Sequence, residues 1–470
     1  MLEHLKCKQS GTLLDVMQVI NTNGKGIAFI VDDENKFCGV MTDGDIRRLL
    51  LGGMDLSAVI GDLPNRDCTI AYSHESFQEM LDKTSESVSI LPVLNENNEL
   101  VDFFQYQNKV YVPVATPNLK GNEFKYLVDA YLSSWISSSG SYIRQFEEEF
   151  SRYCQCDYGV AVSNGTVAIH LALEALVVGE GDEVIVPDLT FAATINAVFH
   201  AGATPVIVDV KEDSWCIDPT EIEKAITEKT KAIIPVHIYG QVCDMDQIMA
   251  LAKKHNLFVI EDCAEAHGAT FKGQKVGSFG DIATFSFFGN KVITTGEGGM
   301  CVTNNSDLND IMCVLRDHGM SKEKRYWHDR VGYNYRMTNL QAAIGVGQLE
   351  RIDEILQFRR EIELAYKDIC HDIDFIQFQE DFENKNRITW LVSALVTKGS
   401  RDVLIANLKA ESIDARPFFY PLSDMEPYKA YTFSNQNSRK LSTIGINFPT
   451  GQALTDKLKT RIKKVFQDFA

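Results

Sequence analysis

The sequence predicts an α/β protein with a mainly parallel sheet, followed by a smaller C-terminal α+β domain and preceded by a separate repeat domain. Short β-branched runs alternate with helical patterns in the middle of the chain, at 182–188, 204–210, 231–240 and 257–263. Nearly continuous apolar strands that alternate with helices indicate a parallel sheet covered on both faces. An internal repeat sets the first hundred residues apart.

The N-terminal part carries a weak internal repeat. Residues 31–40 and 93–102 each have the pattern of a strand, a turn rich in Asp, Glu and Asn, and a second strand. A helix-like segment precedes each of them, at 12–23 and 76–87. The pattern predicts two β-α-β-β units in a first domain, residues 1–110.

A linker and two further domains follow. Residues 108–120 carry two prolines and no helical period, which is typical of a link between domains. A long helical pattern over 338–369 leads into the C-terminal part. We therefore expect a large domain at 113–358 and a small domain at 359–470. The helical patterns between the predicted strands include 222–230 and 245–256.

Composition and charge limit the classes of partner. The chain has 470 residues, 45% of them hydrophobic and 24% charged, which is ordinary for a globular protein. The net charge of −19 argues against nucleic acid and anionic membranes as partners, and no apolar stretch approaches the ~18 residues that span a bilayer. The N-terminus lacks a secretory pattern and the eleven cysteines are scattered, so we expect a cytoplasmic protein. Cys154 and Cys156 lack partners for a metal site, and no metal is expected.

The first of three candidate ligand-binding stretches combines a strand end with a helix start. An apolar strand ends at Val162, Asn164 and Gly165 form a turn, and Thr166 begins a helix. Amide groups at a helix N-terminus bind anions, although a plain helix cap has the same pattern.

The other two stretches carry one charged side chain each. Asp262 ends an apolar strand, where it is either a helix cap or the partner of a ring nitrogen in a cofactor. Lys291 follows the apolar run from Phe285 to Phe288 and precedes two threonines and a glycine-rich turn. Desolvation makes such an amine nucleophilic, as a covalent bond to an aldehyde requires, unless the lysine lies on the surface.

These three features together describe the needs of one cofactor. Pyridoxal phosphate requires a lysine for its aldehyde, an acid for its pyridinium nitrogen and an anion site for its phosphate. The sequence contains no G-x-G-x-x-G after a strand, and no Walker A, H-E-x-x-H or G-x-S-x-G motif. We therefore predict pyridoxal phosphate, with Lys291 and Asp262 as catalytic residues.

Five motifs lie between residues 133 and 350, within the stretch 113–470 that the resemblance covers: SSWISSSGSYIRQFEEEF, VSNGTVAIHLAL, IEDCAEAHGA, TFSFFGNKVITTGEGGM and YWHDRVGYNYRMTNLQAAIGVGQLE. With these motifs the chain resembles the DegT/StrS family of nucleotide-sugar aminotransferases. The resemblance implies the aspartate-aminotransferase-like fold (fold type I). It also implies a homodimer with shared active sites.

The resemblance assigns roles to single residues. Lys291 would carry the cofactor and move the proton, and Asp262 would pair with the pyridinium nitrogen. Glu265 would lie near the cofactor hydroxyl, and Phe191 would stack on the ring. The phosphate would be held by Gly165, Thr166, Ser286 and, from the neighbouring subunit, Asn334.

Substrate contacts are implied for Trp135, Arg416 and Tyr420, and for Arg416 and Tyr420 the bound group is either the nucleotide sugar or the amino donor. Arg416 and Tyr420 belong to the stretch ARPFFYPLSDMEPY, in which Ser423 stands where many relatives have a histidine. This departure affects the finer substrate contacts.

The implied reaction is transamination of a nucleotide-linked 4-keto-6-deoxy sugar with L-glutamate as amino donor. The stretches EDCAEA, FFGNKVITTGEGGM and YWHDRVGYNYRMTN favour the conversion of GDP-4-keto-6-deoxymannose to GDP-perosamine, for a surface polysaccharide such as an O-antigen. Two alternatives stay open. One is the same reaction on a UDP- or dTDP-linked keto sugar, and the other is a nucleotide-sensing regulatory protein with an inactive aminotransferase domain.

The N-terminal repeat resembles a pair of CBS domains. Its first copy continues GVMTDGDIRR, which matches the pattern G-x-x-T-x-x-D, and Thr42 and Asp45 would bind the ribose and phosphate of a regulatory nucleotide. The second copy has Phe104 and Gln107 at these places. The pair therefore either binds nucleotide in one half or serves packing and assembly alone.

Overall fold

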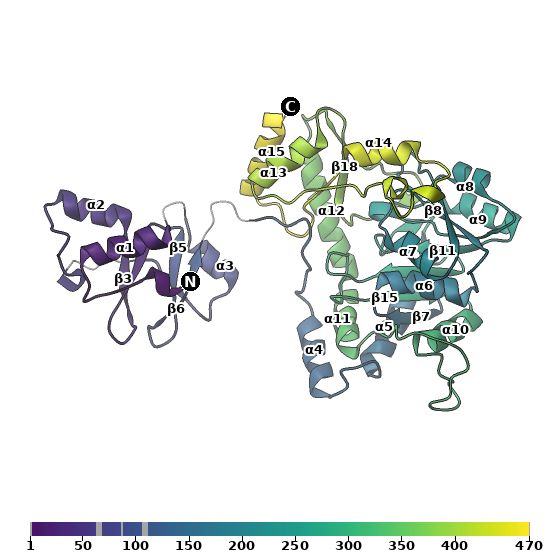
Figure 1. Ribbon diagram of the computed structural model, residues 1–470, viewed down its shortest axis with the longest axis horizontal. Coiled ribbons are helices and arrows are strands. Elements are labelled where there is room, and N and C mark those ends of the chain that lie inside the picture. The colour runs from purple at the N-terminus through teal and green to yellow at the C-terminus, as the bar shows by residue number, and fades with distance from the viewer. Residues whose placement is uncertain (1, 63–67, 86–87, 106–110, 470) are drawn as a thin grey trace. The chain divides into compact units, whose positions relative to one another are not determined.

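The computed structural model describes residues 2–62, 68–85, 88–105 and 111–469 (Figure 1). The chain divides into two compact units, 1–110 and 111–470. Within the described residues, no helix is both long enough and apolar enough to cross a bilayer.

The N-terminal unit contains the predicted repeat. In its first half, β1 pairs in parallel with β2 and β2 pairs antiparallel with β3; in the second half, β4, β5 and β6 pair in the same way. The elements are β1 (Lys6–Lys8), α1 (Leu13–Asn23), β2 (Ile27–Val31), β3 (Phe37–Thr42), α2 (Asp43–Leu51), β4 (Ala71–Tyr72), α3 (Phe77–Asp82), β5 (Ile90–Leu94) and β6 (Leu100–Gln105), with short 3-10 turns at Leu2–Leu5 and Ile60–Asp62.

The two halves of this unit pack on each other. The amide of Phe37 donates to the carbonyl of Asn98 at 2.9 Å, which joins the two hairpin turns. Side chains from both halves share one buried cluster, which includes Phe29, Leu94 and Leu100. The repeat in the sequence is therefore also a repeat in structure.

The C-terminal unit is built on a seven-stranded sheet in the order β7-β15-β14-β11-β10-β8-β9. Within this sheet, the five adjacent strands β14, β11, β10, β8 and β9 run parallel to one another. Strand β15 runs antiparallel to both of its neighbours, β7 and β14. The strands are β7 (Tyr158–Val162), β8 (Glu183–Pro187), β9 (Thr204–Val208), β10 (Thr230–Ile233), β11 (Phe258–Asp262), β14 (Ile282–Ser286) and β15 (Gly299–Thr303). The predicted mainly parallel sheet is confirmed.

Helices cover both faces of this sheet, as Figure 1 shows. On β8, Val184 and Val186 face a cluster completed by α6, α7 and α10, whereas Ile185 faces a cluster completed by α5, α8, α9 and α11. The helices are α4 (Glu123–Leu132), α5 (Ser141–Tyr153), α6 (Gly165–Ala175), α7 (Ala193–His200), α8 (Pro219–Ala225), α9 (Met245–His255), α10 (Ser306–Arg316), α11 (Asn339–Leu349) and α12 (Ile352–Ile369).

Three predicted elements differ from the structure in length. The helix predicted at 222–230 is α8, which begins at Pro219 and ends at Ala225, because Ile226 takes an extended backbone. The strand predicted at 231–240 ends at Ile233, shortly before Pro235, which has no N–H for the ladder. The helical pattern over 338–369 forms two helices, α11 and α12.

The C-terminal lobe has an antiparallel sheet in the order β16-β18-β20-β19. Helix α12 supplies Ile355 to the core of the large sheet and Ile362 to the core of this lobe, so it joins the two. Val112 also packs into the core of this lobe. The boundary predicted between residues 358 and 359 stays a prediction. The elements are β16 (Ile376–Phe378), β18 (Val392–Val396), α13 (Arg401–Ala410), β19 (Arg416–Pro417), α14 (Gln436–Ile444), β20 (Gly445–Phe448) and α15 (Asp456–Phe469); a small separate sheet is formed by β12 (Thr270–Phe271), β13 (Gln274–Lys275) and β17 (Lys385–Asn386).

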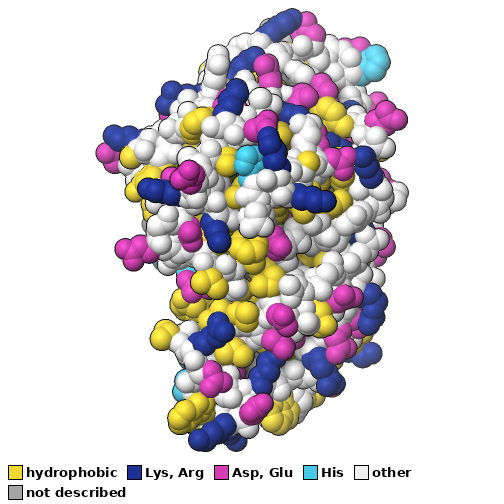
Figure 2. Space-filling model, turned by 90° about the vertical axis from the view of Figure 1, so that its right-hand side faces the viewer, with side chains coloured by type: hydrophobic (Ala, Val, Ile, Leu, Met, Phe, Trp, Pro, Cys, Tyr) yellow, Lys and Arg dark blue, Asp and Glu magenta, His cyan; other side chains and the backbone are white. Residues whose placement is uncertain are grey.

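Charged side chains of both signs are interspersed on the surface that Figure 2 shows. Hydrophobic side chains gather between them in the middle of this view. The net negative charge of the chain is therefore not gathered into one acidic patch on this face.

Candidate active site

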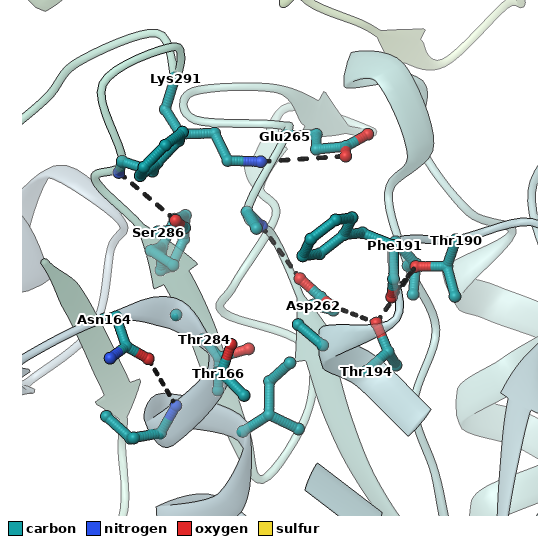
Figure 3. Close-up of a pocket in the computed structure, with 18 of the residues that line it drawn as sticks. Asn164, Thr166, Thr190, Phe191, Thr194, Asp262, Glu265, Thr284, Ser286 and Lys291 are labelled. Carbon is teal, nitrogen blue, oxygen red and sulfur yellow. Dashed lines mark hydrogen bonds and ion pairs between the residues drawn. The ribbon is translucent and has the colours of Figure 1, made fainter. Parts of the chain in front are cut away.

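A cavity of about 820 Å³ is lined by residues from the ends of several strands, a size common for ligand pockets. Figure 3 shows its labelled residues converging from β11, β14 and the start of α6. Three predicted residues, Trp135, Asn334 and Tyr420, do not line it. The predicted residues that do line it are Gly165, Thr166, Phe191, Asp262, Glu265, Ser286, Lys291 and Arg416.

Lys291 lies in a turn that follows β14. Its amide donates to the carbonyl of Phe288 at 2.9 Å, and its own carbonyl accepts a hydrogen bond of 3.0 Å from buried Arg359. The side chain is only 12% exposed, and its Nζ lies 4.2 Å from the centre of the Trp390 ring. Burial lowers the pKa of this ammonium group, which favours the free amine. The alternative that Lys291 lies on the surface is therefore wrong.

Asp262 is the last residue of β11 and is buried. Thr194 Oγ1 donates to its Oδ2 at 2.9 Å, and the amide of Ala264 donates to Oδ1 at 3.2 Å. Turns follow at 263–269, so Asp262 is not a helix cap. Burial raises the pKa of its carboxyl group above the usual range, and a cation in the cavity would restore the ionised form.

Glu265 brings a second buried carboxyl group to the amine. Its Oε1 lies 3.9 Å from Lys291 Nζ, and its Oε2 accepts the amide of Tyr239 at 2.7 Å. Burial raises the pKa of Glu265 to about 7, although the charge on Lys291 opposes the shift. The carboxyl group therefore titrates near neutral pH, beside the amine.

We expect Glu265 to make the stability of the cofactor-free protein depend on pH. The folded state holds the Glu265 proton up to a pKa of about 7, whereas the unfolded chain loses it near 4.5. Between these two pKa values, the folded state binds one proton more than the unfolded chain does. The contribution of Glu265 to the free energy of unfolding is therefore complete below pH 4.5 and is lost as the pH rises through 7. Relative to Glu265→Gln, wild type should lose about 3 kcal/mol across this window in urea unfolding. Parallel pH profiles for the two proteins would contradict this result.

The start of α6 lies against Ser286. Asn164 Oδ1 accepts the amide of Val167 at 3.0 Å and so caps the helix, which begins at Gly165. A Cβ atom on Gly165 would lie 2.8 Å from Cβ of Ser286, so glycine permits this approach. The helix N-terminus and the Ser286 hydroxyl thus face the cavity together, which suits a phosphate group. Asn164 can therefore cap α6 while the same helix N-terminus binds an anion.

Several lining residues carried no signal in the sequence. Thr194 is 68 residues from Asp262, to which it is hydrogen-bonded, and Trp390 comes from the C-terminal lobe. His170 Nδ1 lies 3.0 Å from the hydroxyl of Tyr335, and both residues line the cavity. Only the folded chain brings these side chains together.

Ser423 has a different role from the histidine that the resemblance places there. It is buried, its amide donates to Asp188 Oδ1 at 2.7 Å and its hydroxyl donates to Asp188 Oδ2 at 2.8 Å. Ser423 does not line the cavity. Instead it ties the stretch that carries Arg416 and Tyr420 to the residue after β8.

One buried cluster has the residue types of a metal site: His237, Glu261 and Cys263. Both ring nitrogens of His237 are engaged, since Nδ1 accepts the amide of Cys243 at 3.2 Å and Nε2 lies 3.2 Å from Glu261. Glu261 also accepts three amides of the 277–280 turn. His237 and Glu261 are therefore already hydrogen-bonded within the protein, and Glu261 anchors this turn.

In this cavity a desolvated amine faces a buried acid and a helix N-terminus. The fold and the site together are those of the pyridoxal phosphate enzymes that transfer amino groups. The chain belongs to the DegT/DnrJ/EryC1/StrS aminotransferase family, whose sequence profile matches residues 117–467. The predicted cofactor and fold type are confirmed by this membership.

Relatives of known name match most of this unit. The GDP-perosamine synthase of Escherichia coli O157:H7 is 46% identical over 360 residues, which cover 76% of this chain and 98% of the relative. The GDP-perosamine synthase of Caulobacter vibrioides is 46% identical over 350 residues, covering 73% and 94%. Among solved structures, the aminotransferase from Psychrobacter cryohalolentis is 33% identical with a TM-score of 0.71, covering 76% of this chain and 98% of its own.

The N-terminal unit contains a CBS domain, matched over residues 3–52. There, Thr42 caps α2: its amide and hydroxyl both donate to Asp45 Oδ2, at 3.0 and 2.6 Å. Asp45 Oδ1 also accepts Arg48 at 2.7 Å. In the second half, Gln107 lies outside the described residues, and the role of Thr42 and Asp45 in binding nucleotide stays a prediction.

Proposed function

We propose that this enzyme transfers the amino group of L-glutamate to a GDP-linked 4-keto-6-deoxy sugar, converting GDP-4-keto-6-deoxymannose to GDP-perosamine for a surface polysaccharide such as an O-antigen. The observation that carries this proposal is the 46% identity to a GDP-perosamine synthase over 98% of its length. Lys291, Asp262 and Glu265 converge on one cavity, which argues against an inactive domain.

The residues around the cavity fit pyridoxal phosphate. Gly165 and Ser286 approach closely enough to form a phosphate cradle with Thr166, and Asp262 lies where it can pair with the ring nitrogen. When bound, pyridoxal phosphate supplies an aldehyde for the amino group and a ring that stabilises negative charge on the substrate carbon. Phe191 lines the same cavity and can cover the ring.

The protein residues would then orient the ring and move protons. Asp262, ionised and paired with the ring nitrogen, would keep a proton on it, because its negative charge stabilises the protonated ring. The Lys291 amine, with its pKa lowered by burial, would take the proton from the α-carbon of glutamate and return a proton at the sugar carbon. Glu265 Oε1, at 3.9 Å from Nζ, would hold the amine in place.

We further propose a homodimer with shared active sites. Large apolar side chains of α4 and the segment after it are exposed, which is unusual for a free surface. Asn334 is exposed and does not line the cavity of its own chain, as expected for a residue that reaches a partner's cofactor. The exposed side chains are Phe124 (77%), Tyr131 (67%), Leu132 (74%), Trp135 (61%) and Ile136 (47%).

A reducing compartment such as the cytoplasm is the proposed location, in keeping with eleven free cysteines. We propose a nucleotide as the ligand of the CBS domain, at Thr42 and Asp45. The N-terminal unit would then sense nucleotide or assist assembly.

The proposed substrate can be tested with a panel of GDP-, UDP- and dTDP-linked 4-keto-6-deoxy sugars, with glutamate as donor. We expect the mass of a 4-amino sugar nucleotide from the GDP compound, at a kcat/KM at least about tenfold above the others, which corresponds to about 1.4 kcal/mol of discrimination. Preference for a UDP or dTDP compound would overturn the GDP assignment. Failure of every sugar would overturn the reaction.

A further inference from the structure

Tyr239 is buried completely between the cavity and the C-terminal lobe, although it does not itself line the cavity. Its backbone has φ 50° and ψ 27°, in the left-handed region that non-glycine residues rarely adopt. Gly240 follows with φ 86°, and a Cβ atom there would lie 2.2 Å from the carbonyl oxygen of Ile388. Such a conformation persists only where its surroundings fix it, and it is common at functional sites.

Hydrogen bonds link Tyr239 to opposite sides, and its phenol is also hydrogen-bonded to the side chain of Asn447. Its amide donates to Glu265 Oε2 at 2.7 Å, and Glu265 is the acid beside Lys291. Its phenol oxygen accepts the amide of Phe419 at 2.8 Å. One residue thus joins the acid next to the reactive amine to the segment 416–420, which carries Arg416 and Phe419 into the cavity wall.

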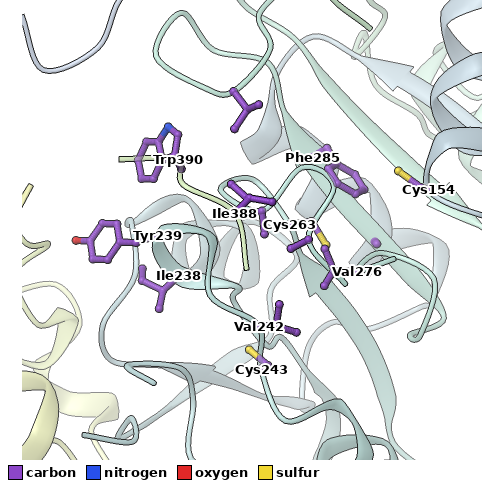
Figure 4. Packing of buried hydrophobic residues seen from close by; sticks show 14 of the residues in the cluster. Cys154, Ile238, Tyr239, Val242, Cys243, Cys263, Val276, Phe285, Ile388 and Trp390 are labelled. Atoms are coloured by element: carbon purple, nitrogen blue, oxygen red, sulfur yellow. The ribbon is translucent and has the colours of Figure 1, made fainter. Parts of the chain in front are cut away.

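Ring contacts reinforce the same link. The Tyr239 ring is stacked on Trp390, with centres 6.0 Å apart, and on Phe419, with centres 5.4 Å apart. Figure 4 shows Tyr239 and Trp390 side by side in the buried cluster. Trp390 in turn lies against Lys291 Nζ, and Phe419 contacts Phe191. A continuous wall of rings therefore runs from the amine to the segment 416–420.

The segment 416–420 lies at the outer part of the site. The side chain of Arg416 lines the cavity and is 61% exposed, and Tyr420 is 57% exposed. Glutamate is small and must react beside Lys291, deep in the cavity. A sugar linked to a nucleotide is longer and would extend from Lys291 toward the exposed part of the cavity wall, where Arg416 lies.

We propose that Tyr239 is a positioning residue for the keto-sugar half of the reaction. Its phenol fixes the segment 416–420 against the sugar nucleotide, while its amide holds Glu265 in place beside Lys291. This inference rests on the proposed function for its substrate. The phenol of Tyr239 would affect only the reaction with the keto sugar, whereas its backbone amide, which holds Glu265, would affect the reactions of both substrates.

The test is Tyr239→Phe, which removes the acceptor for the Phe419 amide and leaves the bond from the backbone to Glu265. We expect KM for the keto-sugar nucleotide to rise about tenfold, as loss of a hydrogen bond that leaves a buried amide unpaired implies. KM for glutamate, and the kcat of the glutamate half-reaction followed by absorbance of the holoenzyme, should stay within about twofold.

Tyr366→Phe is the matched control. Tyr366 is also fully buried and stacked on an aromatic ring, Phe448, but its hydroxyl has no hydrogen-bond partner. The same chemical change there should leave both KM values unaltered. Equal effects of the two variants, or a rise confined to KM for glutamate, would overturn the proposal.

Hydrogen exchange gives a readout that does not depend on activity. In wild-type holoenzyme the Phe419 amide should exchange more slowly than an unprotected amide, and in Tyr239→Phe it should exchange at least about fivefold faster. A fast Phe419 amide in the wild type would overturn the proposal even if the variant failed to fold. If wild type aminates no keto sugar, the proposed substrate fails, whereas the exchange result still decides whether the link exists.

Discussion

Replacing Lys291 by alanine should abolish transamination, with kcat reduced by at least about 10³-fold, because a single amine holds the cofactor and moves both protons. The fold should remain, since the backbone bonds that fix the turn, from the Lys291 amide to Phe288 and from Arg359 to the Lys291 carbonyl, do not involve the lysine side chain. Borohydride reduction of holoenzyme, digestion and mass spectrometry should place the cofactor on the peptide with Lys291. The variant should carry no label there.

Lys275→Ala is the matched control for this experiment. Lys275 is also partly buried, its Nζ lies 4.4 Å from the centre of the Tyr153 ring, and burial lowers its pKa. It does not line the cavity. Activity and labelling should survive its loss. A labelled peptide other than that of Lys291 in wild type would contradict the assignment of the amine.

The sheet and the polar ends of its strands could be predicted from the sequence because both are local patterns. A β-branched run that ends in Asp262 and an apolar run that ends shortly before Lys291 are each visible within ten residues. In a parallel sheet, the carboxyl ends of the strands meet at one edge, so such patterns also predict which side chains converge. The prediction of an anion site rests on a pattern of the same kind, since Gly165 follows a strand and begins a helix.

The surroundings of these residues could not be predicted, because they come from distant parts of the chain. Arg359 binds the Lys291 carbonyl across 68 residues, and the phenol of Tyr239 accepts an amide 180 residues away. The sequence pattern at 231–240 indicated one strand, whereas Pro235 and the left-handed Tyr239 turn its end into a bend behind the site. Ser423 was read as a change in substrate contacts, yet the structure places it on buried Asp188.

Asp262→Asn should retain the fold and lose most of the activity, with kcat lower by about 10²- to 10⁴-fold. An amide oxygen can still accept from Thr194 Oγ1, which now donates at 2.9 Å, so the local packing should be kept. A neutral side chain cannot hold the proton on the ring nitrogen, and this electrostatic contribution is of the size that single preorganised groups supply. Steady-state kinetics and the absorbance spectrum of the holoenzyme measure both effects.

Asp281→Asn is the control for this experiment. It tests whether the loss of activity in Asp262→Asn comes from the position of the carboxylate at the site or from the removal of any carboxylate that supports β11. Asp281 precedes β14, and its Oδ2 accepts the amide of Val259 on β11 at 2.8 Å, so it supports the same strand at its other end. Its substitution should change kcat by less than about twofold, because Asp281 does not line the cavity. Equal losses of activity in the two variants would mean that β11 is being disrupted, and Asp262 would lose its assigned role. An activity of Asp262→Asn close to that of wild type would argue against its pairing with the cofactor ring.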